Sequence, residues 1–131
     1  MVAALGRETG ALSIPIPANA RAAEFIPFNA LLPKSDVFIT NGGFGGTQQA
    51  IAAGVPVIVA GATEDKPATA ARAAYHGLGI NLETGTPTPE AVAAATESVL
   101  KDAGMRDNVE KLAQVYAAHD ALSEIERLTV S

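Results

Sequence analysis

The chain has 131 residues, 48% of them hydrophobic, which is enough for one buried core and corresponds to a single domain. A net charge of -5, with only nine scattered Lys and Arg residues, argues against a nucleic-acid partner. The chain has no cysteine, which rules out disulfides and thiolate metal sites and makes a cytoplasmic location the default expectation. The longest apolar stretch, residues 50–62, is too short to span a membrane and contains Gly54 and Pro56.

The first elements expected along the chain are short. Val2 to Leu5 resembles a strand, and it begins so close to the first residue that we expect a cut edge in an incomplete sheet. Residues 10–20 carry two prolines and predict a loop. Residues 22–26 form a short, mostly apolar run ended by Pro27, and residues 29–32 predict a helical turn.

The middle of the chain alternates between strands and helices. Residues 37–40 and 57–60 are nearly uniformly apolar, as parallel strands covered on both faces tend to be. A helix from Gln48 to Ala53 is expected between them, ended by Gly54 with Pro56 following. A further helix is expected over residues 63–76, and a strand over residues 79–82.

The last third of the chain is predicted to be helical. Thr88 can cap a helix whose first residue is Pro89, and apolar residues then recur at helical spacing as far as Leu128, with a break at Asp120. Alternating strands and helices indicate a doubly wound, Rossmann-like parallel sheet of the α/β class. Ligands of such sheets bind beyond the carboxyl ends of the strands, where Asn41 and Gly61 lie.

A glycine-rich run, NGGFGGT at residues 41–47, directly follows one predicted strand and precedes a predicted helix. Glycines there allow backbone N–H groups to approach an anion closely, and the helix dipole favours negative charge at that end. The run therefore predicts a diphosphate pocket. The alternative is that the turn needs glycines for its shape alone.

Four blocks of the chain resemble a known family. They are FIPFNALLP at 25–33, NGGFGG at 41–46, QAIAAGVP at 49–56 and EDK at 64–66. Together they resemble the donor-binding half of inverting glycosyltransferases that use nucleotide-activated sugars, in particular the bacterial macrolide-type branch. The resemblance implies the C-terminal half of a GT-B architecture, which has two Rossmann-like domains.

The resemblance also assigns the nucleoside end of the donor site. The family has an aromatic residue and a proline beside the nucleotide base, which implies that Phe25 and the backbone of Ile26 lie near the base. The alternative is that Phe25 belongs to the core. Gln49 stands where many members have a Glu that holds ribose hydroxyls. A neutral amide can bond one hydroxyl, which leaves uridine or thymidine open.

The phosphate end departs from the family in two places. The family usually has His where Asn41 stands; Asn donates an N–H bond but carries no charge. Gly45 fits the bacterial branch, whereas Gly46 replaces a usual hydroxyl residue. The resemblance therefore implies that the phosphates rely on the backbone of Gly42, Gly43, Gly45 and Gly46, with the Thr47 hydroxyl as an additional donor.

Two residues correspond to the family's sugar contacts, an acidic residue followed by Gln. Asp65 matches the pattern and Lys66 departs from it. Lys66 has two possible roles, contact with a phosphate oxygen or a solvated place in the first turn of a helix.

The chain has no expected catalytic residue, metal site or cofactor. The family's catalytic base is a His in an acceptor-binding N-terminal domain, which is absent here, and His76 and His119 are expected to be structural or exposed.

The chain is therefore expected to be the donor-binding domain of an enzyme that moves a sugar from a UDP- or TDP-sugar to a hydroxyl of a small lipophilic acceptor. One alternative is a subunit of a split glycosyltransferase that needs a partner chain, and another is a non-catalytic nucleotide-binding module. On its own the chain is expected to be inactive and, because of its cut edge, to form a homo-oligomer or to order its N-terminal segment loosely.

Overall fold

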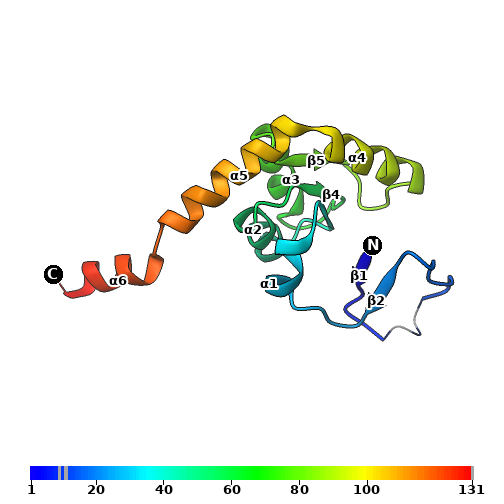
Figure 1. The fold of residues 1–131 in the computed structure, drawn as a ribbon, viewed down its shortest axis with the longest axis horizontal. Helices are drawn as coiled ribbons and strands as arrows, with labels where there is room; N and C mark the ends of the chain where they lie inside the picture. The colour runs from blue at the N-terminus through cyan, green and yellow to red at the C-terminus, as the bar shows by residue number, and fades with distance from the viewer. Residues whose placement is uncertain (9, 11, 131) are drawn as a thin grey trace.

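A computed structural model describes residues 1–8, 10 and 12–130 of the chain. Strands and helices alternate over the first two thirds of the described part, and the remainder is helical (Figure 1). The elements are β1 Val2–Ala4, β2 Arg21–Ala23, α1 Phe28–Leu31, the 3-10 helix η2 Leu32–Lys34, β3 Phe38–Thr40, α2 Phe44–Ala52, β4 Val57–Val59, α3 Lys66–Tyr75, β5 Gly79–Asn81, α4 Pro89–Lys101, α5 Ala103–Ala118 and α6 Ala121–Val130.

The central sheet is parallel, with strand order β3-β4-β5. Its middle strand is buried on both faces: Val57, Ile58 and Val59 are fully buried. Val57 and Val59 pack with residues of α2, α3 and α5, whereas Ile58 packs with residues of α4. Helices therefore cover both faces of this sheet, as its uniformly apolar strands predict.

The structure corrects the expectation of a single sheet. β1 and β2 pair with each other in parallel but form their own two-stranded sheet, which lies beside the main body (Figure 1). Within the described residues, β1 pairs only with β2 and β3 only with β4. A hydrophobic pattern predicts that a segment is a strand but not which strand pairs with it, because that depends on contacts distant in sequence. The residues 10–20 predicted as a loop contain no regular element over 12–20, and position 11 lies outside the described residues.

Helix ends were predicted with mixed success. Thr88 caps α4 as expected, since its hydroxyl oxygen accepts a hydrogen bond from Ala91 N–H. Gly54 and Gly77 follow α2 and α3 with positive φ angles, as expected of glycines after a helix. The break before α6 lies at His119 and Asp120. A break between α4 and α5 was not predicted; there the side chain of Asp102 accepts from Met105 N–H and caps α5.

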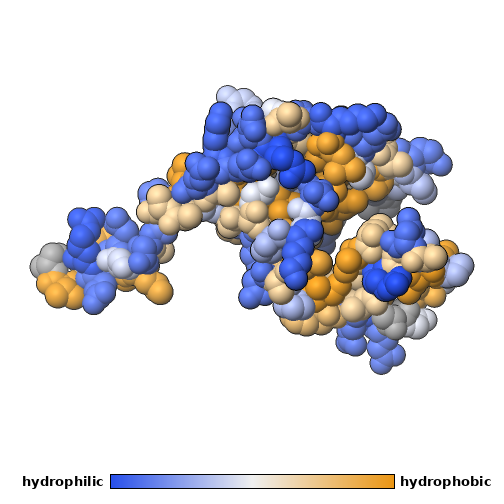
Figure 2. All heavy atoms as spheres, in the orientation of Figure 1, coloured by the Kyte–Doolittle hydropathy of each residue, from blue (hydrophilic) through white to orange (hydrophobic). Residues whose placement is uncertain are grey.

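The exposed apolar side chains include groups on the β1–β2 unit and on α6. Figure 2 shows apolar atoms over the β1–β2 unit and on α6, which extends away from the body in Figure 1. α6 has no buried residue. Among the exposed large hydrophobic residues are Val2, Ile14, Ile16, Phe25, Leu122, Ile125 and Leu128. No helix in the described part of the chain combines the length and apolarity needed to cross a membrane.

Candidate functional site

The start of α2 is the first feature of the site. The helix begins at Phe44, four residues earlier than the predicted Gln48, so the glycine run forms its first turn. The first bond within the helix runs from Thr47 N–H to Gly43 O (3.1 Å), and the N-cap residue, Gly43, provides no side-chain cap. The N–H groups of residues 44–46 precede that bond and have no acceptor within the helix. Such a turn favours an anion.

The turn before α2 is held by two side chains. Gly42 N–H donates to Thr40 Oγ1 (3.2 Å), and Gly43 N–H donates to Asn41 Oδ1 (3.1 Å). Because these two backbone donors are engaged, an anion would meet the N–H groups of the helix's first turn. Asn41 is exposed, and among the described residues its amide N–H₂ has no partner.

Two glycines are required by the geometry of this turn. Gly42 has φ +89°, and a Cβ there would lie 2.7 Å from Val59 Cγ1. A Cβ on Gly61 would lie 1.9 Å from the carbonyl oxygen of Asn41. The end of β4 therefore packs directly against Asn41 and fixes the position of the turn relative to the sheet.

Gly45 differs from Gly42. A Cβ at Gly45 would have no atom within 4 Å, and its φ is not positive. Nothing in the described part of the chain therefore requires glycine at this position. The explanation by shape alone holds for Gly42 and fails for Gly45, where the open space lies beside the free N–H groups of α2.

Thr47 is 1% exposed, and its hydroxyl donates to Gly43 O (2.9 Å). While this bond is made, the hydroxyl proton is not available to a phosphate. An anion at this turn would therefore meet backbone donors and neighbouring cations.

Lys66 lies next to this turn. Its Cβ is 3.4 Å from where a Gly42 Cβ would be and 3.1 Å from the corresponding point on Gly61. The side chain of Lys66 is 17% exposed, and its ammonium lies 3.1 Å from Glu64 Oε2. Lys66 is therefore not a solvated residue of the first turn of α3. It places a positive charge near the starts of α2 and α3.

A separate cleft unites the residues expected at the nucleoside end. It has a volume of about 680 Å³, and Phe25, Ile26 and Gln49 line it together with the end of β1 and the start of α1. Phe25 is 79% exposed, so it does not belong to the core. An exposed aromatic ring beside a cleft can stack on a base.

The remaining polar candidates are not among the residues shown to contact the turn before α2 or to line the cleft beside Gln49. Asp65 is exposed at the N-cap of α3, where its side chain makes no capping bond. His76 ends α3 and His119 ends α5, and both are exposed. Neither His lines the cleft beside Gln49.

Sequence reasoning missed the roles of Thr40, Gly61 and Glu64. Gly61 was expected at the carboxyl edge of the sheet, but its close packing against the Asn41 carbonyl oxygen was not expected. Glu64 lies within the EDK block, and its positive φ of 59° carries no signature in the sequence. Thr40 has no signal beyond its place as the last strand residue before the glycines.

The fold and this edge of the sheet define a Rossmann-like α/β domain that presents an uncapped helix start at the carboxyl ends of its strands. The family described as erythromycin biosynthesis protein CIII-like, C-terminal domain, matches residues 1–130. The chain therefore belongs to this family, and its fold is that of the C-terminal half of GT-B glycosyltransferases. The resemblance seen in the sequence is confirmed.

Individual relatives support the same family membership. UDP-glycosyltransferase 2 of Phaeomoniella chlamydospora is 46% identical over 110 residues, 84% of this chain and 24% of the relative. The 4'-demethylrebeccamycin synthase of Lentzea aerocolonigenes is 43% identical over 108 residues, 82% of this chain and 26% of the relative. The solved structure of the glycosyltransferase VinC in complex with DTDP superimposes with a TM-score of 0.88 at 28% identity, over 98% of this chain and 33% of that one. The chain thus spans about a quarter of the length of these curated relatives.

Proposed function

We propose that residues 1–131 form the nucleotide-sugar donor-binding domain of a glycosyltransferase. The acceptor-binding domain would belong to a longer form of the same polypeptide or to a partner chain. The complete enzyme would move a sugar from a UDP- or TDP-sugar to a hydroxyl of a small lipophilic acceptor. The observation that carries this proposal is the uncapped first turn of α2, with open space at Gly45 and Lys66 beside it. The complex of VinC with DTDP supports a thymidine or uridine diphosphate as the ligand.

In this proposal, each group of residues has its own part. Phe25, Ile26 and Gln49 hold the nucleoside, with the ring stacking on the base and the amide bonding a ribose hydroxyl. The N–H groups at Phe44, Gly45 and Gly46, the Asn41 amide and the Lys66 ammonium hold the diphosphate, and Gly42 and Gly43 shape the turn. Asp65 contacts the sugar. As the sugar leaves, negative charge grows on the diphosphate, and these fixed dipoles and the cation stabilise it.

The surroundings of the domain are also proposed. Among the described residues, β1 and β3 each have an edge without a partner strand, and the β1–β2 unit exposes apolar residues. These features suit a further domain, a partner chain or a second copy. Cytoplasmic location remains a proposal that fractionation would test.

The test is equilibrium binding of UDP, TDP, uridine and thymidine to the 131-residue chain. We expect both diphosphates to bind about tenfold more tightly than their nucleosides, because the charged donors contact only the phosphates. Equal affinity for nucleoside and diphosphate would contradict the proposal. We do not expect the 131-residue chain alone to transfer a sugar. If it did, the proposal that the acceptor-binding domain lies outside these residues would be wrong.

A further inference from the structure

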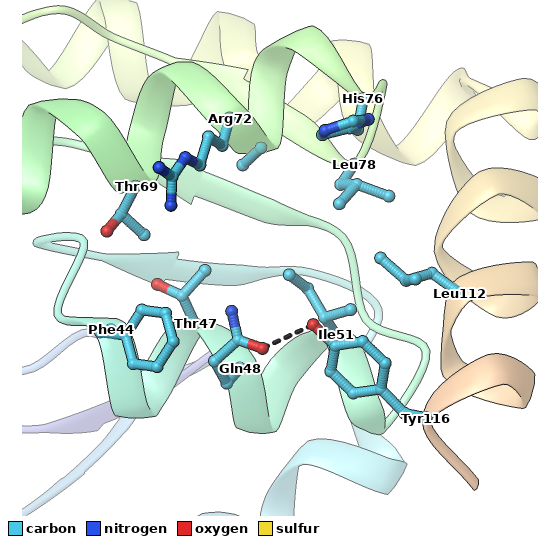
Figure 3. Close-up of a pocket in the computed structure, with 11 residues that line it drawn as sticks. Phe44, Thr47, Gln48, Ile51, Thr69, Arg72, His76, Leu78, Leu112 and Tyr116 are labelled. Atoms are coloured by element: carbon cyan, nitrogen blue, oxygen red, sulfur yellow. Dashed lines mark hydrogen bonds between the residues drawn. The ribbon is translucent and has the colours of Figure 1, made fainter. Parts of the chain in front are cut away.

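A second hollow lies between α2, α3 and α5, with a volume of about 230 Å³ (Figure 3). We call it the three-helix groove. Its lining residues come from α2, α3, α5 and the loop that leads to β5, and none of them lines the cleft that holds Phe25 and Gln49. The groove is therefore distinct from the nucleoside cleft, but Phe44 and Thr47 also line it, so it borders the proposed phosphate site at the start of α2.

The floor of the groove is apolar. Ile51 from α2, Leu78 before β5 and Leu112 from α5 line it, and Ile51 and Leu78 are 4% and 5% exposed. These side chains belong to, or pack against, the main core cluster, so the floor is rigid. A rigid apolar floor next to solvent favours the tail of a small ligand.

Two nitrogen donors, from Gln48 and Arg72, face the groove. Tyr116 O–H donates to Gln48 Oε1 (2.5 Å), and this bond turns the amide nitrogen of Gln48 toward the groove (Figure 3). Arg72 extends from α3 over the same space, and among the described residues its guanidinium has no hydrogen-bond or ion-pair partner. His76 lies on the same side of α3, one turn further on.

The described lining residues include no Asp or Glu. A guanidinium and an amide N–H₂ above an apolar floor match a ligand with an anionic head and an apolar tail. The planar fork of Arg72 suits the two oxygens of a carboxylate. The small volume limits the tail to a short chain or a single ring.

We propose that the three-helix groove binds a small monocarboxylate with an apolar tail, with Arg72 and Gln48 at the head and Ile51, Leu78 and Leu112 at the tail. Its head and tail residues lie outside the proposed donor contacts, and the proposal does not rest on the donor function.

Octanoate is the probe, compared with acetate, which lacks the tail, and with octanol, which lacks the charge. Backbone amide shifts of the isotope-labelled chain report both affinity and location. We expect octanoate to shift lining residues of α2, α3 and α5, and to bind at least about fivefold more tightly than acetate or octanol. Equal binding of octanol, shifts elsewhere, or no binding up to on the order of 10 mM octanoate would overturn the proposal.

Two variants separate the head from general surface charge. Arg72→Gln should weaken octanoate binding about fivefold with little effect on folding, because Arg72 is exposed. The control is Arg127→Gln, which removes an exposed cation from α6, and it should leave the affinity unchanged. Unchanged affinity in Arg72→Gln, or an equal loss in both variants, would contradict the assignment. A saturating concentration of UDP should not displace octanoate; displacement would mean that octanoate occupies the donor site instead.

Discussion

The ammonium of Lys66 lies 3.1 Å from the carboxylate of Glu64, while the stem of Lys66 rests against Gly42 and Gly61. A cation at the first residue of α3 is unfavourable for the helix dipole, and the start of α2 adds a second positive end. Glu64, 76% exposed, neutralises this charge in the free protein. We infer that a bound diphosphate would compete with Glu64 for Lys66.

Glu64→Gln is therefore expected to raise the affinity for UDP or TDP, by about two- to fivefold, since the competing carboxylate is removed and exposed pairs are weak. Lys66→Met should lower it by about fivefold or more. Calorimetric titration measures both. Lys101→Met is the control, because Lys101 pairs with Glu97 on α4 and should not affect binding. A loss of affinity in Glu64→Gln would contradict the competition.

Gly45→Ala separates a ligand-binding role of the glycine run from a purely structural one. A Cβ at this position meets no atom, so folding should be unchanged or stabilised by about 0.5 kcal/mol. The same methyl group would stand beside the free N–H groups, so diphosphate affinity should fall about tenfold. Denaturant unfolding and calorimetry on one sample give both values. Unchanged affinity would mean that no ligand approaches closely at Gly45.

Gly61→Ala should instead destabilise the protein. Its Cβ would overlap the Asn41 carbonyl oxygen, so the turn must shift, with an expected loss of about 2–3 kcal/mol in the free energy of unfolding. Urea unfolding measures it. A loss near zero would show that the end of β4 does not hold the turn.

Asp120 gives a prediction that depends on pH. The hydrogen bonds from the side chain and backbone of Ser123 lower the pKa of Asp120, which caps α6. A pKa that is lower in the folded state stabilises the helix above the ordinary carboxylate pKa, and this contribution is lost as the pH falls through the lowered value, below about 4. The protection of the α6 amides, taken as exchange relative to the intrinsic rate at each pH, should therefore fall at low pH, and Asp120→Ala should remove that dependence. An unchanged profile in the variant would contradict the capping role.

Local chemistry explains how much of the molecule could be predicted. The strands at Val57 and Phe38, the cap at Thr88 and the left-handed Gly54 depend on residues close in sequence, and all were predicted. The separation of β1 and β2 from the main sheet and the packing of Gly61 against Asn41 depend on residues distant in sequence, and neither was foreseen.

The candidate site divides in the same way. The glycine run and its place between strand and helix are visible in the sequence. That Thr47 turns its hydroxyl back to Gly43, and that Lys66 is mostly buried beside Glu64, depends on side-chain orientation. A pattern of residue types does not specify orientation, so these features required the structure.

The central claim is that the start of α2 binds the diphosphate of a nucleotide sugar. The most direct measurement is a titration of the isotope-labelled chain with UDP and TDP, followed by backbone amide shifts. The largest shifts are expected at residues 41–47 and Lys66, followed by Phe25, Ile26 and Gln49. Shifts confined to α4, α5 and α6, with residues 41–47 unchanged, would contradict the claim.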